Sequence, residues 1–395
     1  MENERMAILK MLEEGKITAG EASKLLQAVS ETVSQPTART QNTQQRPNGG
    51  TVQKIETDNS AKRFEEFAGE MSKKFETFAK DMEPKLQKFT EAVVEGTVTV
   101  ADKISKSLAT PPATAPRTTQ SVVPIYSTAM PATGEKNFEL RISSKDCELN
   151  ITGLNGNVLL KGYNGDKISG KIYCQAKKAG ASIEFMQLGN KYSLNYNEDD
   201  FKSVSIDAYV PEYLFKHITA QTINGTLSLS TLNTEILTVS NANGKTDIQD
   251  IVCKNLSYES NNGSMNLANI QAENAKLENF NGSSQVMNLD IRNLQMESFN
   301  GAIHMVIPSL ETYPEYMWEL NSSNAALTLN VPGGSEIGYF VKAHTTLSEI
   351  KVGLTGMNYV ANSKTHLEAQ SFNYDSAKTK VKLALETSNA PLTLN

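Results

Sequence analysis

Cysteine is scarce in this chain of 395 residues, and long apolar runs are missing altogether. Cys147, Cys174 and Cys253 lie far apart and form no CxxC pair, which argues against a zinc site and against a disulfide framework. No stretch approaches the ~18 consecutive apolar residues of a membrane span. Charged residues interrupt the opening MENERMAILKMLEEGK, so the sequence predicts no signal peptide and, by default, a cytoplasmic location.

The sequence also lacks an excess of basic residues and the common catalytic motifs. The formal net charge of −6 gives no electrostatic footprint for a nucleic-acid partner. None of the four histidines belongs to an HxxxH, HxH or HExxH pattern, and the chain has no G-x-S-x-G elbow and no phosphate-binding G-x-x-x-x-G-K-[ST] loop. Asp199 and Asp200 lie in a polar stretch that favours a solvated turn. We therefore predict no catalytic residue, no cofactor and no metal ligand, and a protein that is not an enzyme.

Residues 1–30 have the pattern of a small α-helical hairpin. Apolar residues recur at helical spacing, and Gly15 stands where a glycine commonly ends a helix. Thr18-Ala19-Gly20-Glu21 then fits the S/T-x-x-E capping box that begins a second helix. Residues 31–60 follow as a polar linker rich in Gln, Thr, Pro and Gly, a composition typical of disorder.

A long amphipathic helix is predicted over residues 61–108. Its apolar stripe is heptad-like, with a stutter at Pro84. The segment carries nine Lys/Arg and nine Asp/Glu residues, which favours intramolecular packing or a homo-oligomeric coiled coil. Contact with a membrane surface is the alternative, because interfacial helices bury Phe side chains like those of this stripe. The candidate partner or membrane face consists of Phe64, Phe67, Met71, Phe75, Phe78, Met82 and Phe89. The Pro/Thr-rich residues 109–134 are predicted to be a second linker.

From residue 135 to residue 395 the apolar pattern changes to a period of two, which is typical of strands. Within this region one uncommon dipeptide recurs five times at a spacing of 19 residues. The repeated pairs are Asn224-Gly225, Asn243-Gly244, Asn262-Gly263, Asn281-Gly282 and Asn300-Gly301. Each unit between them also repeats its apolar positions, as in NGTLSLSTLNTEILTVSNA. The repeats continue to the end, because SSNAALTLN at 322–330 is echoed by TSNAPLTLN at 387–395.

This period predicts a mainly β protein with a C-terminal β-solenoid of ~19-residue coils, each holding two strands and two turns. One unit cannot bury its inward face, whereas stacked units bury a continuous core. Asn and Gly both tolerate the positive φ that a corner requires, although an Asn-Gly hairpin is the local alternative. We interpret the Asn-Gly pairs as structural corners, whose asparagines stack in a hydrogen-bonded ladder.

The opening ERMAILKMLEEGKITAGEASKLLQAV closely resembles the N-terminal hairpin of YvlB/LiaX-like proteins of Gram-positive bacteria. Residues 135–395, with their NG-x-apolar-x-apolar units and closing Val-Pro and Ile-Pro pairs, resemble the "putative adhesin" β-strand repeat domain of the same proteins. The resemblance implies a sensor or regulator in the cell-envelope stress response, associated with the membrane or cell surface. It transfers no functional residue, because the family has no defined catalytic motif.

Three functions are compatible with this organisation. The first is a stress sensor whose residues 1–108 bind a membrane protein, the membrane surface or a membrane-active antimicrobial peptide. The second is an adhesin-like structural protein that binds cell-wall glycan or protein through the solenoid surface. The third is a cytoplasmic scaffold that oligomerises through residues 61–108.

Overall fold

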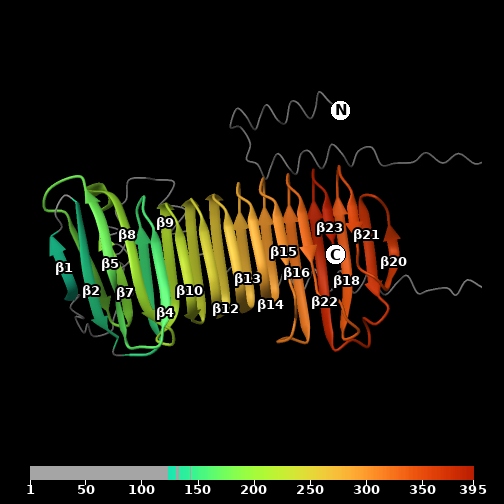
Figure 1. Ribbon diagram of the computed structural model, residues 1–395, viewed down its shortest axis with the longest axis horizontal. Coiled ribbons are helices and arrows are strands. Elements are labelled where there is room, and N and C mark those ends of the chain that lie inside the picture. The colour runs from blue at the N-terminus through green and yellow to red at the C-terminus, as the bar shows by residue number, and fades with distance from the viewer. Residues whose placement is uncertain (1–122, 130–132, 143) are drawn as a thin grey trace, which may run out of the picture. The chain divides into compact units, whose positions relative to one another are not determined.

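The computed structural model describes residues 123–129, 133–142 and 144–395 of the chain. The predicted hairpin (1–30), linker (31–60) and amphipathic helix (61–108) lie outside the described residues. All described residues belong to one compact unit. They form strands almost throughout, and successive strands stack side by side along one axis (Figure 1). The mainly β, solenoid fold predicted from the 19-residue period is confirmed.

The stack opens with antiparallel pairing. Strand β6 lies between β1 and β7, and β5 lies between β2 and β8. The linker predicted over 109–134 is therefore wrong in part, because β1 falls within it and gains its strand conformation from pairing with β6. The elements here are β1 (Val123–Ala129), β2 (Thr133–Arg141), β3 (Cys147–Gly153), β4 (Val158–Tyr163), β5 (Lys167–Ala176), β6 (Ser182–Leu188), β7 (Lys191–Tyr196), the 3-10 helix η1 (Glu198–Asp200), β8 (Phe201–Pro211) and β9 (Phe215–Asn224).

The central coils pair in parallel, with each residue beside the residue 19 positions further along the chain. The coils begin where β10 pairs with β4 and β11 pairs with β9. These strands are β10 (Leu227–Asn233), β11 (Ile236–Asn243), β12 (Thr246–Asn262), β13 (Met265–Asn279), β14 (Ser284–Ser298), β15 (Ile303–Val306), β16 (Glu315–Ser322) and β17 (Leu327–Asn330).

Each complete coil contains three pairing segments rather than the two strands predicted. In β12 the pairing with β13 is interrupted at Asp250 and again at Lys254. Asp250 has φ 55°, and the equivalent Asn269 and Asn288 both have φ 56°. Asn and Asp tolerate this left-handed conformation better than most residues. A single residue therefore makes a corner, which the hydrophobic period alone does not reveal.

The C-terminal coils stack in an order that differs from the order of the sequence. Strand β22 lies between β16 and β18, and β23 lies between β17 and β19. The last coil along the chain is thus inserted between two earlier ones, and antiparallel β21 and β20 close the end. These strands are β18 (Ile337–Thr345), β19 (Ile350–Val352), β20 (Met357–Asn362), β21 (His366–Ser371), β22 (Thr379–Thr387) and β23 (Leu392–Leu394).

The core consists of columns of inward side chains, one from each coil. One buried column contains Leu160, Leu229, Ile248, Leu267, Val286, Met305, Leu329 and Leu394. A second contains Ile218, Leu237, Leu256, Ala275, Leu294, Trp318, Leu383 and Val341. The indole Nε1–H of Trp318 donates to the carbonyl oxygen of Ile291 at 2.7 Å, so the only tryptophan is buried without a lost hydrogen bond.

Candidate functional site

The features of the described residues that bear on function are their titratable groups, their corners and their exposed faces. Among these residues, no three His, Cys, Asp or Glu side chains are grouped so that they could hold a metal ion. Cys147, Cys174 and Cys253 are buried and form no disulfide. Burial raises the pKa of the Cys253 thiol to about 12, which is the opposite of what a nucleophilic thiolate needs.

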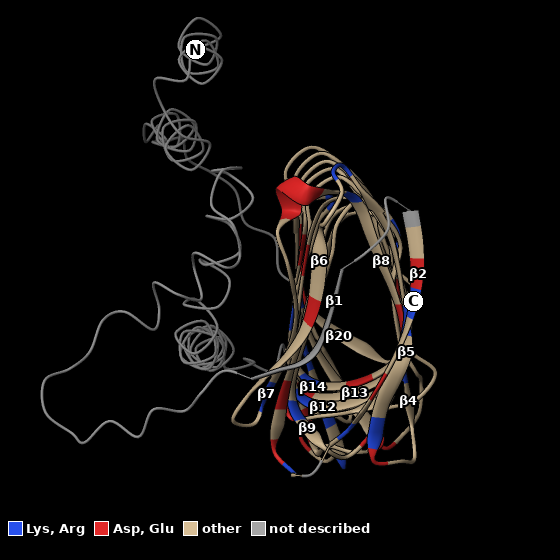
Figure 2. Ribbon diagram, turned by 90° about the vertical axis from the view of Figure 1, so that its left-hand side faces the viewer, with Lys and Arg blue, Asp and Glu red and all other residues tan. Residues whose placement is uncertain are grey.

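The acidic turn that contains Asp199 and Asp200 is a structural feature in which Asp199 is exposed and the Asp200 side chain is only 17% exposed. It forms η1, the red element at the top of the opening end of the domain (Figure 2). The Asn197 side chain accepts a hydrogen bond from the Asp199 backbone N–H, and Lys178 pairs with Asp200 at 2.6 Å. The Asp200 carboxylate therefore has an ion-pair role, and the turn contact of Asp199 is made by its backbone.

All five Asn-Gly pairs predicted as corners lie at one corner of the stack. Their asparagines belong to a longer column in which each Nδ2 donates to the Oδ1 of the rung before it. Six of these hydrogen bonds measure 2.6 to 2.9 Å, and a seventh joins Asn224 to Asn155. We call this column the asparagine ladder: Asn155, Asn224, Asn243, Asn262, Asn281, Asn300, Asn324 and Asn389.

The glycines of the same corner are required by the close approach of successive coils. A Cβ atom built on Gly263 would lie 1.8 Å from the carbonyl oxygen of Gly244, and one on Gly282 would lie 1.6 Å from that of Gly263. Backbone cannot yield at such distances without separating the coils. The Asn-Gly pairs therefore form closely packed corners, and in the folded stack their asparagine side chains are engaged in the ladder.

A buried polar column inside this corner was missed by the sequence reasoning. Its members stand two residues before each rung of the ladder from Asn224 onward, and they are Thr222, Asn241, Ser260, Asn279, Ser298, Ser322 and Thr387. Asn279 donates to the carbonyl oxygens of Gly263 and Gly282 at 3.1 and 2.8 Å, and Ser298 donates to that of Gly301 at 2.6 Å. The recurring pattern [T/N/S]-x-N-[G/A] was the available signal.

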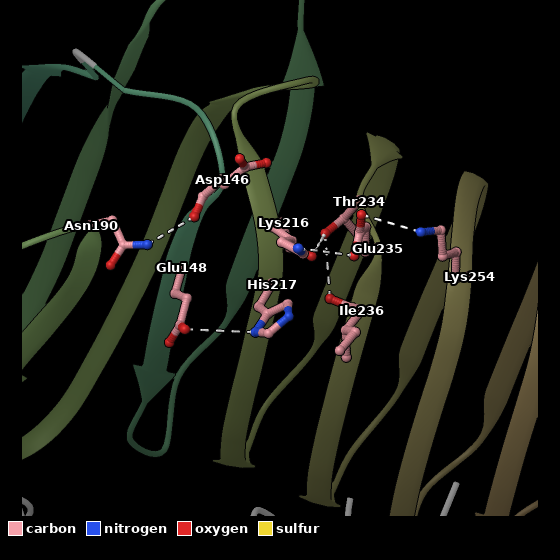
Figure 3. A network of polar contacts seen from close by, with 9 residues as sticks. All are labelled: Asp146, Glu148, Asn190, Lys216, His217, Thr234, Glu235, Ile236 and Lys254. Carbon is pink, nitrogen blue, oxygen red and sulfur yellow. Dashed lines mark hydrogen bonds and ion pairs between the residues drawn. The ribbon is translucent and has the colours of Figure 1, made fainter. Parts of the chain in front are cut away.

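Charges of alternating sign occupy a second corner, at the start of the strand segments that end at the asparagine ladder. Lys216, Glu235, Lys254, Glu273 and Arg292 follow one another at intervals of 19 residues. Glu235 pairs with Lys254 at 3.2 Å and with Lys216 at 3.4 Å (Figure 3). The hydrogen bond from Lys254, together with the charge of Lys216, holds the pKa of the Glu235 carboxyl below its usual value. Exposed pairs of this kind contribute little stability.

A tyrosine face covers the outer side of β4, β5 and β8. Tyr173 and Tyr209 are 40% and 49% exposed, and the ring of Tyr163 meets that of Tyr209 edge-on at a centroid distance of 6.3 Å. Lys161 lies directly opposite Tyr209, and Asp207 lies opposite Lys171 on the next strand. We define the tyrosine face as Lys161, Tyr163, Lys171, Tyr173, Asp207 and Tyr209. Exposed aromatic rings among polar groups are typical of binding surfaces.

A second exposed apolar feature lies on the central coils, directly before two rungs of the asparagine ladder. Phe280 and Phe299, 51% and 44% exposed, stack with centroids 4.9 Å apart and an interplanar angle of 6°. Beside them runs a column of three glutamates from successive coils, Glu259, Glu278 and Glu297. Burial raises the pKa of Glu259 and Glu297, and the carboxylate of Glu278 between them raises both further.

The predicted partner or membrane face of residues 61–108 cannot be compared with these surfaces. Phe64, Phe67, Met71, Phe75, Phe78, Met82 and Phe89 all lie outside the described residues. In the part of the chain that the structure does describe, no helix is both long enough and apolar enough to cross a membrane.

The fold defines the class of protein: a β-solenoid whose central coils pair in parallel. The family model "Toastrack DUF4097" matches residues 149–386, more than half of the chain, and the chain belongs to this family. A model for a SHOCT-like domain matches residues 3–32, which overlap all but the first two residues of the predicted helical hairpin (1–30). A search of curated proteins found no match.

Several solved structures are similar to the chain at low sequence identity. A "putative adhesin" from Bacteroides fragilis NCTC 9343 is 12% identical, with 66% of this chain and 97% of that chain covered and a TM-score of 0.39. A "putative adhesin" from Parabacteroides distasonis ATCC 8503 is 7% identical, with coverages of 66% and 97% and a TM-score of 0.37. A "putative cell adhesion protein" from Clostridium sporogenes ATCC 15579 is 10% identical, with coverages of 66% and 98% and a TM-score of 0.23.

Proposed function

We propose that the protein is a non-enzymatic, adhesin-like binding protein whose solenoid attaches to a cell-wall glycan through the tyrosine face. The carrying observation is the pair of exposed rings, Tyr173 and Tyr209, on a broad sheet surface, with Lys171 and Asp207 between them and Lys161 beside Tyr209 on β4. Tyrosine rings offer an apolar platform and a polar tip at low conformational cost. The flat side of a sugar ring stacks on such a platform, while the lysines and the aspartate hydrogen-bond its hydroxyl groups.

The outward columns next to this face suit a repeating polymer. Strand β10 continues the surface with Ser228 and Ser230, and β12 continues it with Asp247 and Gln249. Successive parallel strands are about 4.8 Å apart, so small polar groups recur at a fixed interval along the stack. A polymer of regular sugar units can therefore form the same hydrogen bond several times, which raises avidity without a deep pocket.

The test is cosedimentation of the full-length protein with purified Gram-positive cell walls stripped of protein by protease. We expect the wild type to sediment with the walls, and the double variant Tyr173→Ser/Tyr209→Ser to stay in solution. The matched control is Phe280→Ser/Phe299→Ser, which removes two equally exposed rings from another surface and should sediment as the wild type does. The proposal is contradicted if the wild-type protein does not sediment with the stripped walls, or if the tyrosine variant still does.

A second candidate function is regulation of the envelope-stress response. It is supported by the match of residues 3–32 to a SHOCT-like domain, which marks a separate unit outside the solenoid, and by the resemblance of the opening residues to YvlB/LiaX-like proteins. In this function residues 61–108 contact a membrane-active peptide or the membrane surface. Full-length protein that floats with anionic vesicles, and loses this with Phe75→Ser/Phe78→Ser, would support it; absence of flotation and of binding to a cationic peptide would contradict it.

A further inference from the structure

The corner of the solenoid concentrates a reactive dipeptide. When glycine follows asparagine, the glycine backbone nitrogen can attack the asparagine Cγ atom with little steric hindrance. The N–Cγ bond forms, the Cγ–Nδ2 bond breaks, and ammonia leaves with the proton of the backbone N–H. Water then opens the resulting succinimide to aspartate or isoaspartate. Six rungs of the asparagine ladder, from Asn155 to Asn300, are followed by glycine.

In the folded stack, hydrogen bonds hold both reacting groups, the asparagine side-chain amide and the glycine backbone N–H. For Asn243, the Nδ2 group donates to Asn224 at 2.9 Å and the Oδ1 atom accepts from Asn262 at 2.8 Å. The nucleophile is held as well, because the Gly244 N–H donates to the Asn262 carbonyl oxygen at 3.1 Å. The Gly225 N–H is bound in the same way to Asn243, also at 3.1 Å. Attack requires the loss of these hydrogen bonds and a rotation of the side chain out of the ladder.

We propose that the asparagine ladder is a latent deamidation site, closed while the coils are stacked and open once they separate. Conversion would also prevent the coils from stacking again. An aspartate at position 281 replaces the Nδ2 donor with a carboxylate oxygen that faces the Asn262 Oδ1 atom, which is itself an acceptor. Isoaspartate adds an atom to the backbone at a corner where a mere Cβ on Gly282 would lie 1.6 Å from the preceding coil. Deamidation thus makes the opening of a coil irreversible.

The chain contains its own controls. Asn164-Gly165 is the same dipeptide in an exposed turn between β4 and β5, away from the ladder. Asn324 and Asn389 are rungs of the ladder that are followed by alanine. Comparing Asn164 with the Asn-Gly rungs isolates the effect of stacking on the deamidation rate. Comparing Asn324 and Asn389 with those rungs isolates the effect of the following glycine.

The experiment incubates the full-length protein at mildly alkaline pH, folded and in denaturant, and follows each asparagine by peptide mass spectrometry. In the folded protein Asn164 should convert first, and Asn243, Asn262 and Asn281 at least about tenfold more slowly; tenfold corresponds to ~1.4 kcal/mol of local opening free energy. In denaturant the four should convert at similar rates, ahead of Asn324. Equal rates for Asn164 and Asn262 in the folded protein would overturn the proposal.

A second measurement tests the consequence of conversion. Asn281→Asp reproduces the product in the ladder, and Asn164→Asp reproduces it in the exposed turn. We expect the urea midpoint to fall for Asn281→Asp and to stay at the wild-type value for Asn164→Asp. If Asn281→Asp unfolds at the wild-type midpoint, deamidation does not prevent restacking and the irreversible step is wrong.

Discussion

The buried polar column inside the Asn-Gly corner should matter more to stability than the ladder on its surface. Asn279 is 2% exposed, and its Nδ2 group donates to two glycine carbonyl oxygens and to the Ser284 Oγ atom at 2.8 to 3.2 Å. Asn281, two residues later, lies on the outside, and its side chain exchanges hydrogen bonds with ladder asparagines. The pair allows a comparison of buried and exposed amides at one turn.

The magnitude follows from the hydrogen bonds that Asn279→Ala removes. The two Nδ2 hydrogens serve three acceptors, so two hydrogen bonds at about 1 kcal/mol each are lost, and the glycine carbonyls are left buried with one partner fewer. The Asn279 Oδ1 atom has no hydrogen-bond partner among the described residues, so its removal offsets part of the loss. We expect Asn279→Ala to lower the free energy of unfolding by about 2–3 kcal/mol, and Asn281→Ala by about 1 kcal/mol or less.

The assay is urea unfolding of the two variants followed by circular dichroism, with the slope of the transition checked for constancy. Asn279→Ser is the matched control, because Ser260 and Ser298 occupy the same position in the neighbouring coils. Serine should recover more than half of the loss. The reasoning is refuted if Asn281→Ala is as destabilising as Asn279→Ala, or if serine at 279 is no better than alanine.

Three further predictions follow from the packing of the coils. Gly263→Ala should destabilise the domain by about 3 kcal/mol, since its Cβ meets backbone at 1.8 Å, whereas Gly333→Ala, with nothing within 4 Å of the added carbon, should leave the thermal midpoint unchanged. Glu259→Gln should raise stability at pH 7 by about 0.2–1 kcal/mol. The folded-state pKa of Glu259 is raised above 4.5, so ionisation of Glu259 opposes folding. The gain from glutamine therefore appears as the pH rises from 4.5 through the folded-state pKa, and it is absent from urea unfolding curves measured below pH 4.5. Deletion of 379–395 removes the coil between β16 and β18 and should abolish cooperative unfolding of the C-terminal coils, seen as protease sensitivity after residue 310.

The repeating part of the fold could be predicted because one rare dipeptide marks each coil. The spacing from Asn224 to Asn300 fixes the coil length, and stacking of identical corners then follows from parallel pairing. The position of the last coil could not be predicted. The echo between 322–330 and 387–395 shows that both segments form the same part of a coil, but only the pairing of β22 with both β16 and β18 reveals the inserted order.

The surfaces were harder to predict than the scaffold for a related reason. Tyr173 and Tyr209 are 36 residues apart in the sequence and carry no motif. They share a face because β5 and β8 pair antiparallel in one register, and that register is set by tertiary packing rather than by local sequence. The inward Asn241 and Asn279 were overlooked for the opposite reason: asparagine near a glycine suggests an exposed turn, and only the stack shows that these amides point into the core.

The most direct test of the account is hydroxyl-radical footprinting of the full-length protein with and without a soluble, protein-free fragment of cell-wall glycan. The account predicts that oxidation of Tyr173 and Tyr209 falls when the fragment is present, while oxidation of Phe280 and Phe299 stays constant. Unchanged tyrosine oxidation at a saturating concentration of a fragment that binds would place the binding surface elsewhere and contradict the assignment of the tyrosine face.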